Sequence, residues 1–91
     1  MKFIYPAVFT PAPEGFVATF PDLTGCTAKG RDLDEAIENA HEAALDWINA
    51  ELAEDEPMMP GVSEPDEIDL PEGGILRFIA VTYRFYDGYD E

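Results

Sequence analysis

The stretch from Phe20 to Ile48, FPDLTGCTAKGRDLDEAIENAHEAALDWI, decides the fold of this 91-residue chain, because it joins a turn, a short strand and one long helix in a single run. Asp32 stands just before the apolar periodicity, and Glu35 follows three residues later, which predicts a capping box at a helix start. We therefore predict a helix over residues 33–52. Its apolar residues recur at three- and four-residue spacing and share one arc: Leu33, Ala36, Ile37, Ala40, Ala43, Ala44, Trp47 and Ile48.

Three strands are predicted before this helix, over residues 2–10, 15–20 and 26–29, because these segments are rich in aromatic and β-branched residues or are bounded by turn residues. The first two are predicted to form an antiparallel hairpin. We expect Asp22 to accept backbone amides of its own turn, as aspartate commonly does after proline. The turn itself is predicted to be built by Pro21, Asp22, Gly25 and Cys26.

The segment 53–74 changes in character, since it holds four prolines, eight acidic residues and no basic residue. It is too rich in proline for a helix or a strand, and a connection of this length is uncommon in a small domain. One interpretation is an extended connector; the other is a segment that contacts a partner. In the first case its apolar anchors would be Met58, Met59, Val62, Ile68 and Leu70.

Residues 75–86 form the longest strand candidate, and apolar side chains alternate onto both of its faces. One helix can cover only one face of a sheet, so we expect a second subunit to cover the other and the protein to be a homodimer or a higher homo-oligomer. A right-handed crossover would bring this strand back parallel to the first, giving the strand order 3-2-1-4. The predicted fold is a single α+β domain over residues 1–91, a two-layer β-β-β-α-β sandwich with one helix on one face of the sheet.

The charge of the chain limits its partners. Twenty acidic residues against five basic ones give a formal net charge of −15, which repels nucleic acids and anionic membranes and attracts basic proteins. With no signal peptide and no long apolar run, we expect a cytoplasmic location. The candidate partner-binding residues are the acidic arc of the helix and two methionines of the connector: Glu38, Glu42, Asp46, Met58 and Met59.

Catalysis is not expected from this sequence. Cys26 and His41 are the possible nucleophile and base, and no third group is evident to orient them. The first and last strands lack the converging carboxylates that a two-metal nuclease needs. No phosphate-binding loop, dinucleotide motif or zinc spacing is present, so we predict no enzyme activity, no bound metal and no cofactor.

Two motifs at a fixed separation carry a family resemblance. The first is the run Phe20 to Cys26, FPDLTGC, and the second is the helix segment 32–45, which contains DLDEA, then NA, then AAL. Over about residues 3–52 the chain resembles the HicB-like antitoxins, whose pattern is FPDLxGC followed by a helix of the form EAxxNAxEA. That resemblance implies a partial ribonuclease-H-like fold and a function, which is to hold a small basic HicA-type mRNA-cleaving toxin inactive.

Many members of that family add a C-terminal DNA-binding domain, whereas this sequence ends soon after its last predicted strand, so it does not support autorepression by a DNA-binding tail and leaves autoregulation open. Two functions therefore remain open from the sequence. The first is a non-catalytic antitoxin whose charge attracts a basic toxin. The second is a stand-alone homo-oligomeric regulatory or small-ligand-binding domain that has no toxin partner.

Overall fold

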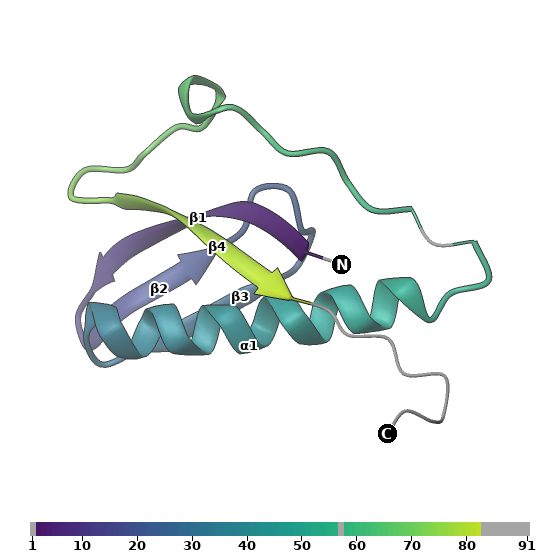
Figure 1. Ribbon diagram of the computed structural model, residues 1–91. Helices are drawn as coiled ribbons and strands as arrows, with labels where there is room; N and C mark the ends of the chain where they lie inside the picture. Colours follow the sequence, from purple (N-terminus) through teal and green to yellow (C-terminus); the bar gives the residue numbers. More distant parts are fainter. Residues whose placement is uncertain (1, 57, 83–91) are drawn as a thin grey trace.

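A four-stranded antiparallel sheet covered on one face by a single long helix forms the body of the protein (Figure 1). The computed structural model describes residues 2–56 and 58–82. Its strands are β1 (Lys2–Ala12), β2 (Gly15–Thr19), β3 (Thr27–Gly30) and β4 (Ile75–Thr82), and its helices are α1 (Leu33–Leu52) and a short 3-10 helix, η1 (Pro65–Glu67). The strand order β3-β2-β1-β4 confirms the predicted order and the α+β class. The predicted residues 83–86 of the last strand lie outside the described residues.

The helix begins where the sequence predicts, because local groups fix its first turn. An Asp32 Oδ1 accepts the amide of Glu35 at 2.8 Å, which is the first half of the predicted capping box. The second half differs: Glu35 Oε1 accepts the amide of Arg31 at 2.7 Å rather than that of Asp32. The Arg31 guanidinium also reaches the Glu35 carboxylate, at 3.1 Å, and this ion pair draws the carboxylate one residue upstream.

The core lies between α1 and the sheet. Four helix residues at a spacing of four, Ala36, Ala40, Ala44 and Ile48, are almost completely buried. Because three of them are alanines, the helix lies close to the strands. At Gly30 in β3 a Cβ atom would come within 2.2 Å of the Ala36 amide nitrogen, so this contact requires glycine. Opposite the helix, β1, β2 and Phe20, which directly follows β2, contribute the largest part of the core: Tyr5, Ala7, Phe9, Ala18 and Phe20.

The direction of β4 is not the predicted one. It pairs with β1 in the antiparallel sense, with Phe9 opposite Ile75 and Lys2 opposite Thr82, so the parallel crossover is wrong. The physical reason is the connector, 53–74: it leaves the C-terminal end of α1 and returns along the sheet to the end where β4 begins (Figure 1). A long return segment after the helix reverses the direction in which the final strand must run.

The side chains on the two faces of the sheet differ in how far they are exposed to solvent. On the helix side, Ile79 and Val81 of β4 are buried. On the other side Phe78 is 46% exposed and Ile4 of β1 is 44% exposed, whereas Pro6 and Val8 of β1 are buried there. We call this second side the open face. The prediction that one helix leaves half of the last strand uncovered therefore holds for the described residues.

Candidate protein-binding surface

The acidic arc of α1 points to solvent. Glu38, Glu42 and Asp46 follow one another at a spacing of four residues, so they form one row along the helix, and all three are exposed. We call this row the outer helix face. Among the described residues the ion pair found is Arg31–Glu35, which lies in the turn before this row. The outer helix face thus presents three carboxylates to solvent.

A second acidic surface lies at the end of α1. Glu51, Glu54, Asp55, Glu56 and Met58 line an open hollow of about 560 Å³. The Met58 amide donates to Glu51 Oε2 at 3.0 Å, which holds the connector against the helix end while the Met58 side chain stays 79% exposed. The last helical turn contains no basic residue, so the negative end of the helix dipole adds to these charges.

The two candidate methionines lie in different environments. Met58 is exposed beside the acidic hollow, whereas Met59 is half-buried and packs against the core. The structure therefore does not bring the five candidate residues together in one surface. Three of them lie on the outer helix face, and Met58 lies in the acidic hollow. Met59 packs against the core and holds the connector there. Of the other expected apolar anchors, Val62 and Leu70 are about half exposed, at 52% and 47%.

Polar contacts that the sequence did not reveal hold the connector to the sheet instead. Ser63 donates to the Asp22 carboxylate twice, from its amide at 2.8 Å and from its hydroxyl at 2.5 Å. The Tyr5 hydroxyl donates to the Pro60 carbonyl at 2.6 Å. Burial raises the pKa of this Tyr5 hydroxyl, and the nearby Asp22 charge raises it further. The hydroxyl therefore remains protonated and able to donate across the physiological range.

The prediction that Asp22 accepts hydrogen bonds from the amides of its own turn is therefore wrong. Its carboxylate accepts hydrogen bonds from a residue 41 positions away rather than from its own turn. Backbone contacts close that turn: the amides of Leu23 and Cys26 donate to the carbonyls of Phe20 and Leu23, respectively. Gly25 supplies a positive φ of 81°, and Pro21 is exposed at the turn's surface.

Cys26 and His41, the possible nucleophile and base, lie in different environments. Cys26 is buried, and burial raises the pKa of its thiol, with a smaller contribution from the Asp46 charge. A raised pKa disfavours the thiolate that nucleophilic chemistry requires. His41 is exposed on α1. Across the described residues, no three side chains of the metal-ligating types converge on one point.

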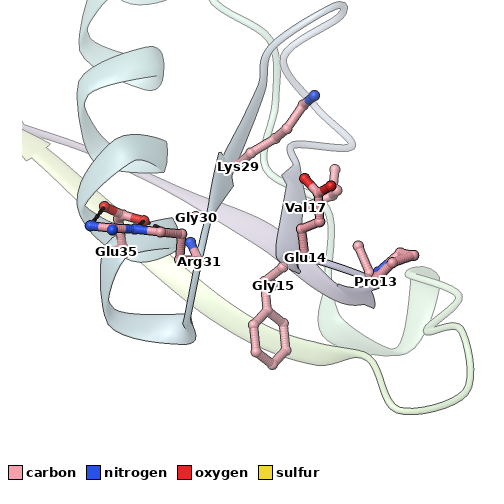
Figure 2. Close-up of a pocket in the computed structure, with 10 residues that line it drawn as sticks. Pro13, Glu14, Gly15, Val17, Lys29, Gly30, Arg31 and Glu35 are labelled. Carbon is pink, nitrogen blue, oxygen red and sulfur yellow. Dashed lines mark hydrogen bonds and ion pairs between the residues drawn. The ribbon is translucent and has the colours of Figure 1, made fainter.

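A pocket of about 440 Å³ opens between the β1–β2 hairpin and the start of α1. Figure 2 shows Arg31 held by Glu35 on one side of it, while Lys29 extends away from that pair. Basic and acidic side chains line it in equal number, Lys29 and Arg31 against Glu14 and Glu35. This mixture leaves no single charge in excess to select a ligand.

Neither helix in the described part of the chain has the length and apolar character that crossing a bilayer requires.

Comparison with known proteins places these features in a family. A family model described as a HicB_like antitoxin of a bacterial toxin-antitoxin system matches residues 5–81. An uncharacterized 14.9 kDa protein of Haemophilus phage HP1 is 33% identical over 69 residues, which are 76% of this chain. The chain spans about half, 52%, of that phage protein.

Solved structures agree with the family match. A chain of a HicA3 and HicB3 toxin-antitoxin complex is 34% identical and has a TM-score of 0.70, over 89% of this chain and 100% of that one. The antitoxin HicB3 is 31% identical with a TM-score of 0.67, over 98% and 75% of the two chains. The N-terminal domain of the Burkholderia pseudomallei antitoxin HicB is 23% identical, so its TM-score of 0.74, over 89% and 100%, shows the shared fold.

Proposed function

The chain belongs to the HicB-like antitoxins of bacterial toxin-antitoxin systems, and from that premise we propose that it binds and neutralises a small basic HicA-type mRNA-cleaving toxin without catalysing any reaction itself. The observation that carries the proposal is the outer helix face, where Glu38, Glu42 and Asp46 are exposed in one row. A related protein occurs in a HicA3 and HicB3 complex, which supports a toxin of that type as the partner.

Electrostatics gives the proposed mechanism. A ribonuclease must attract the phosphates of RNA, so its substrate-binding surface is basic. A chain of net charge −15 is attracted to the same surface and competes with RNA for it. Carboxylates in a row fix the orientation of the toxin and speed the encounter, and the bulk of the domain then covers the RNA-binding side.

The acidic hollow is the second contact that we propose. Its exposed Met58 offers an unbranched, adaptable side chain, and carboxylates surround it. A toxin arginine or lysine could lay its aliphatic stem on Met58 and its charge among the carboxylates. Met59 instead contributes indirectly, because its packing against the core holds this part of the connector in place.

The test is binding of a co-expressed HicA-type toxin by a charge-neutralised variant. The triple change Glu38→Gln, Glu42→Gln, Asp46→Asn removes three charges from the outer helix face. The matched control Glu14→Gln, Asp69→Asn, Glu72→Gln removes three exposed charges elsewhere. Measured by stopped-flow at low salt, association should slow about tenfold in the first variant and clearly less in the control, since short-range steering depends on where the charges lie.

The inhibition assay completes this test. The protein should suppress cleavage of an RNA by the toxin, and the outer-face variant should need a higher concentration to do so. Equal association rates for the two triple variants would contradict the outer helix face as the docking surface. Failure of the toxin to co-purify at all would instead favour the stand-alone regulatory domain.

A further inference from the structure

The outer edge of β4 is the longest uncovered strand edge in the described part of the chain. β4 is last in the order β3-β2-β1-β4, so it pairs with β1 on one side and with no described strand on the other. Its length of 8 residues is twice the 4 residues of β3, which is the opposite edge. Such an edge presents a row of backbone donors and acceptors, and it readily pairs with another strand.

The usual protections of an edge are weak here. Strand edges are commonly blocked by proline, by a bulge or by several charged side chains. β4, with the sequence ILRFIAVT, contains no proline, and its register with β1 runs without interruption from Ile75 to Thr82. Its one charged residue is Arg77. An exposed edge of this kind favours association.

Charge selects the partner for this edge. Two copies of a chain with a net charge of −15 repel each other, so they can associate where carboxylates are absent. The strands β1 and β4 contain no aspartate or glutamate and carry Lys2 and Arg77. β3 also lacks a carboxylate and carries Lys29, but Asp32, Asp34 and Glu35 at the start of α1 follow it closely. A basic toxin is attracted to the acidic surfaces, whereas the β4 edge suits a second copy of this chain.

Apolar surface lies beside the same edge on the open face. Phe78 of β4 is opposite Pro6 of β1, and Ile4 is opposite Ala80, so these side chains share the open face and are contiguous. Phe78 and Ile4 are 46% and 44% exposed, and Ala80 is also exposed. Pro6 itself is buried, so the exposed apolar surface beside the β4 edge consists of Phe78, Ile4 and Ala80.

We propose that β4 pairs antiparallel with β4 of a second copy about a two-fold axis at Phe78, which joins two four-stranded sheets into one of eight strands. In this register Phe78 lies opposite Phe78 of the second copy, and Leu76 lies opposite Ala80. The central pair buries the most exposed aromatic side chain of the strand, and directly opposite aromatic residues stabilise strand pairs. A contact of one strand pair is small, so we expect a dimer that dissociates in the micromolar range.

Analytical ultracentrifugation of the full chain tests the pairing. We expect about 20 kDa, twice the 10.1 kDa of one chain, at tens of micromolar. Phe78→Glu places two carboxylates opposite each other and should weaken association at least about tenfold. The control Thr19→Glu adds the same charge to an exposed position of the open face on β2, away from the edge, and should change it far less. Circular dichroism checks that both variants remain folded.

Salt separates this proposal from the proposed function. Added sodium chloride screens the repulsion between two acidic copies, so the dimer should strengthen as salt rises, whereas a complex with a basic toxin should weaken. A chain that stays monomeric at every salt concentration would overturn the pairing while leaving the antitoxin proposal standing. A chain that forms the dimer but does not bind the toxin would overturn the antitoxin proposal and leave the β4 pairing standing.

Crosslinking tests the register. In a Cys26→Ala background, mixed Leu76→Cys and Ala80→Cys chains should be joined by a short bismaleimide, because those positions lie opposite each other. Ala80→Cys alone should not crosslink, since its two copies lie four residues apart along the strand. Efficient crosslinking of Ala80→Cys with itself, or a dimer unaffected by Phe78→Glu, would show that another surface joins the copies. If the toxin rather than a second copy occupied the edge, Phe78→Glu would abolish toxin binding and leave the chain monomeric throughout.

Discussion

At the scale of single residues, Asp22 shows how a turn residue can serve a distant segment. Its carboxylate accepts two hydrogen bonds from Ser63, and the Tyr5 hydroxyl supports the same stretch through Pro60. No local pattern in the sequence pairs Asp22 with Ser63, because the two belong to segments whose approach depends on the path of the whole connector. The turn could be predicted from its residues, whereas the partner of its aspartate could not.

Removing the Ser63 hydroxyl tests this tether. Ser63→Ala should destabilise the protein by about 1 kcal/mol, since it deletes a partly buried hydrogen bond to a carboxylate. Chemical denaturation measures the loss, and faster amide hydrogen exchange over residues 58–63 should accompany it. Ser63→Thr keeps the hydroxyl and is the control. A double-mutant cycle with Asp22→Ala should show coupling, and strict additivity would contradict a direct contact.

A second prediction at the residue scale concerns how the contribution of Glu35 to stability depends on pH. Hydrogen bonds from the Arg31 side chain and amide lower the pKa of the Glu35 carboxyl in the folded protein. A group with a lowered folded pKa stabilises the fold above its unfolded value, about 4.5, and this contribution is lost as the pH falls through the lowered pKa. Glu35→Gln should therefore melt below the wild type at pH 7, and the gap should close in strong acid.

The control for this pH effect is Glu38→Gln, which removes a carboxylate from the same helix outside the ion pair. Thermal melts from pH 7 to pH 2 follow both variants. A gap between Glu35→Gln and the wild type that is constant with pH would show that the carboxylate charge is unimportant to this helix start.

At the scale of elements, the helix and the last strand differ in how well the sequence predicts them. The helix bounds, residues 33–52, were predicted correctly because the cap at Asp32 and the alanine spacing act within a few residues. The position of β4 beside β1 was also predicted, but its direction was not. Direction depends on whether the connector returns along the sheet before the strand begins, and the composition of 53–74 does not encode that path.

The contact between α1 and β3 yields an element-scale prediction. Gly30→Ala would place a methyl group against the backbone at Ala36, so the helix must move away from the sheet. Overpacking of this kind costs about 1–3 kcal/mol, measurable by denaturation. Gly61→Ala is the matched control, because a Cβ there meets nothing within 4 Å. Equal stabilities for the two variants would mean that the helix contact is not tight.

At the scale of the whole molecule, charge works against compactness. Twenty acidic residues in 91 repel one another across a small domain, so the proposed ability to attract a basic partner costs folding stability. Sequence composition predicted this excess. It could not predict how the structure distributes it, with carboxylates on the outer helix face and in the hollow but none on strands β1 and β4.

Raising the salt concentration should therefore stabilise the isolated protein. We expect the melting temperature to rise as sodium chloride increases from about 20 to 200 mM, because screening shortens the range of the repulsion. The triple change Glu38→Gln, Glu42→Gln, Asp46→Asn should reduce that rise. The measurement is made at a low protein concentration, so that self-association does not contribute. A melting temperature that does not change with salt would contradict a dominant role for repulsion between the acidic side chains.

The antiparallel return of β4 also determines when the protein can finish folding during its synthesis. Lys2 pairs with Thr82, so the start of β1 waits for a residue that is made long after it. Until then β1 has β2 on one side and an empty edge on the other, and contacts so distant in sequence form slowly. A nascent chain thus exposes the β1 edge until the helix, the connector and β4 have all been made, and the sheet is completed only then.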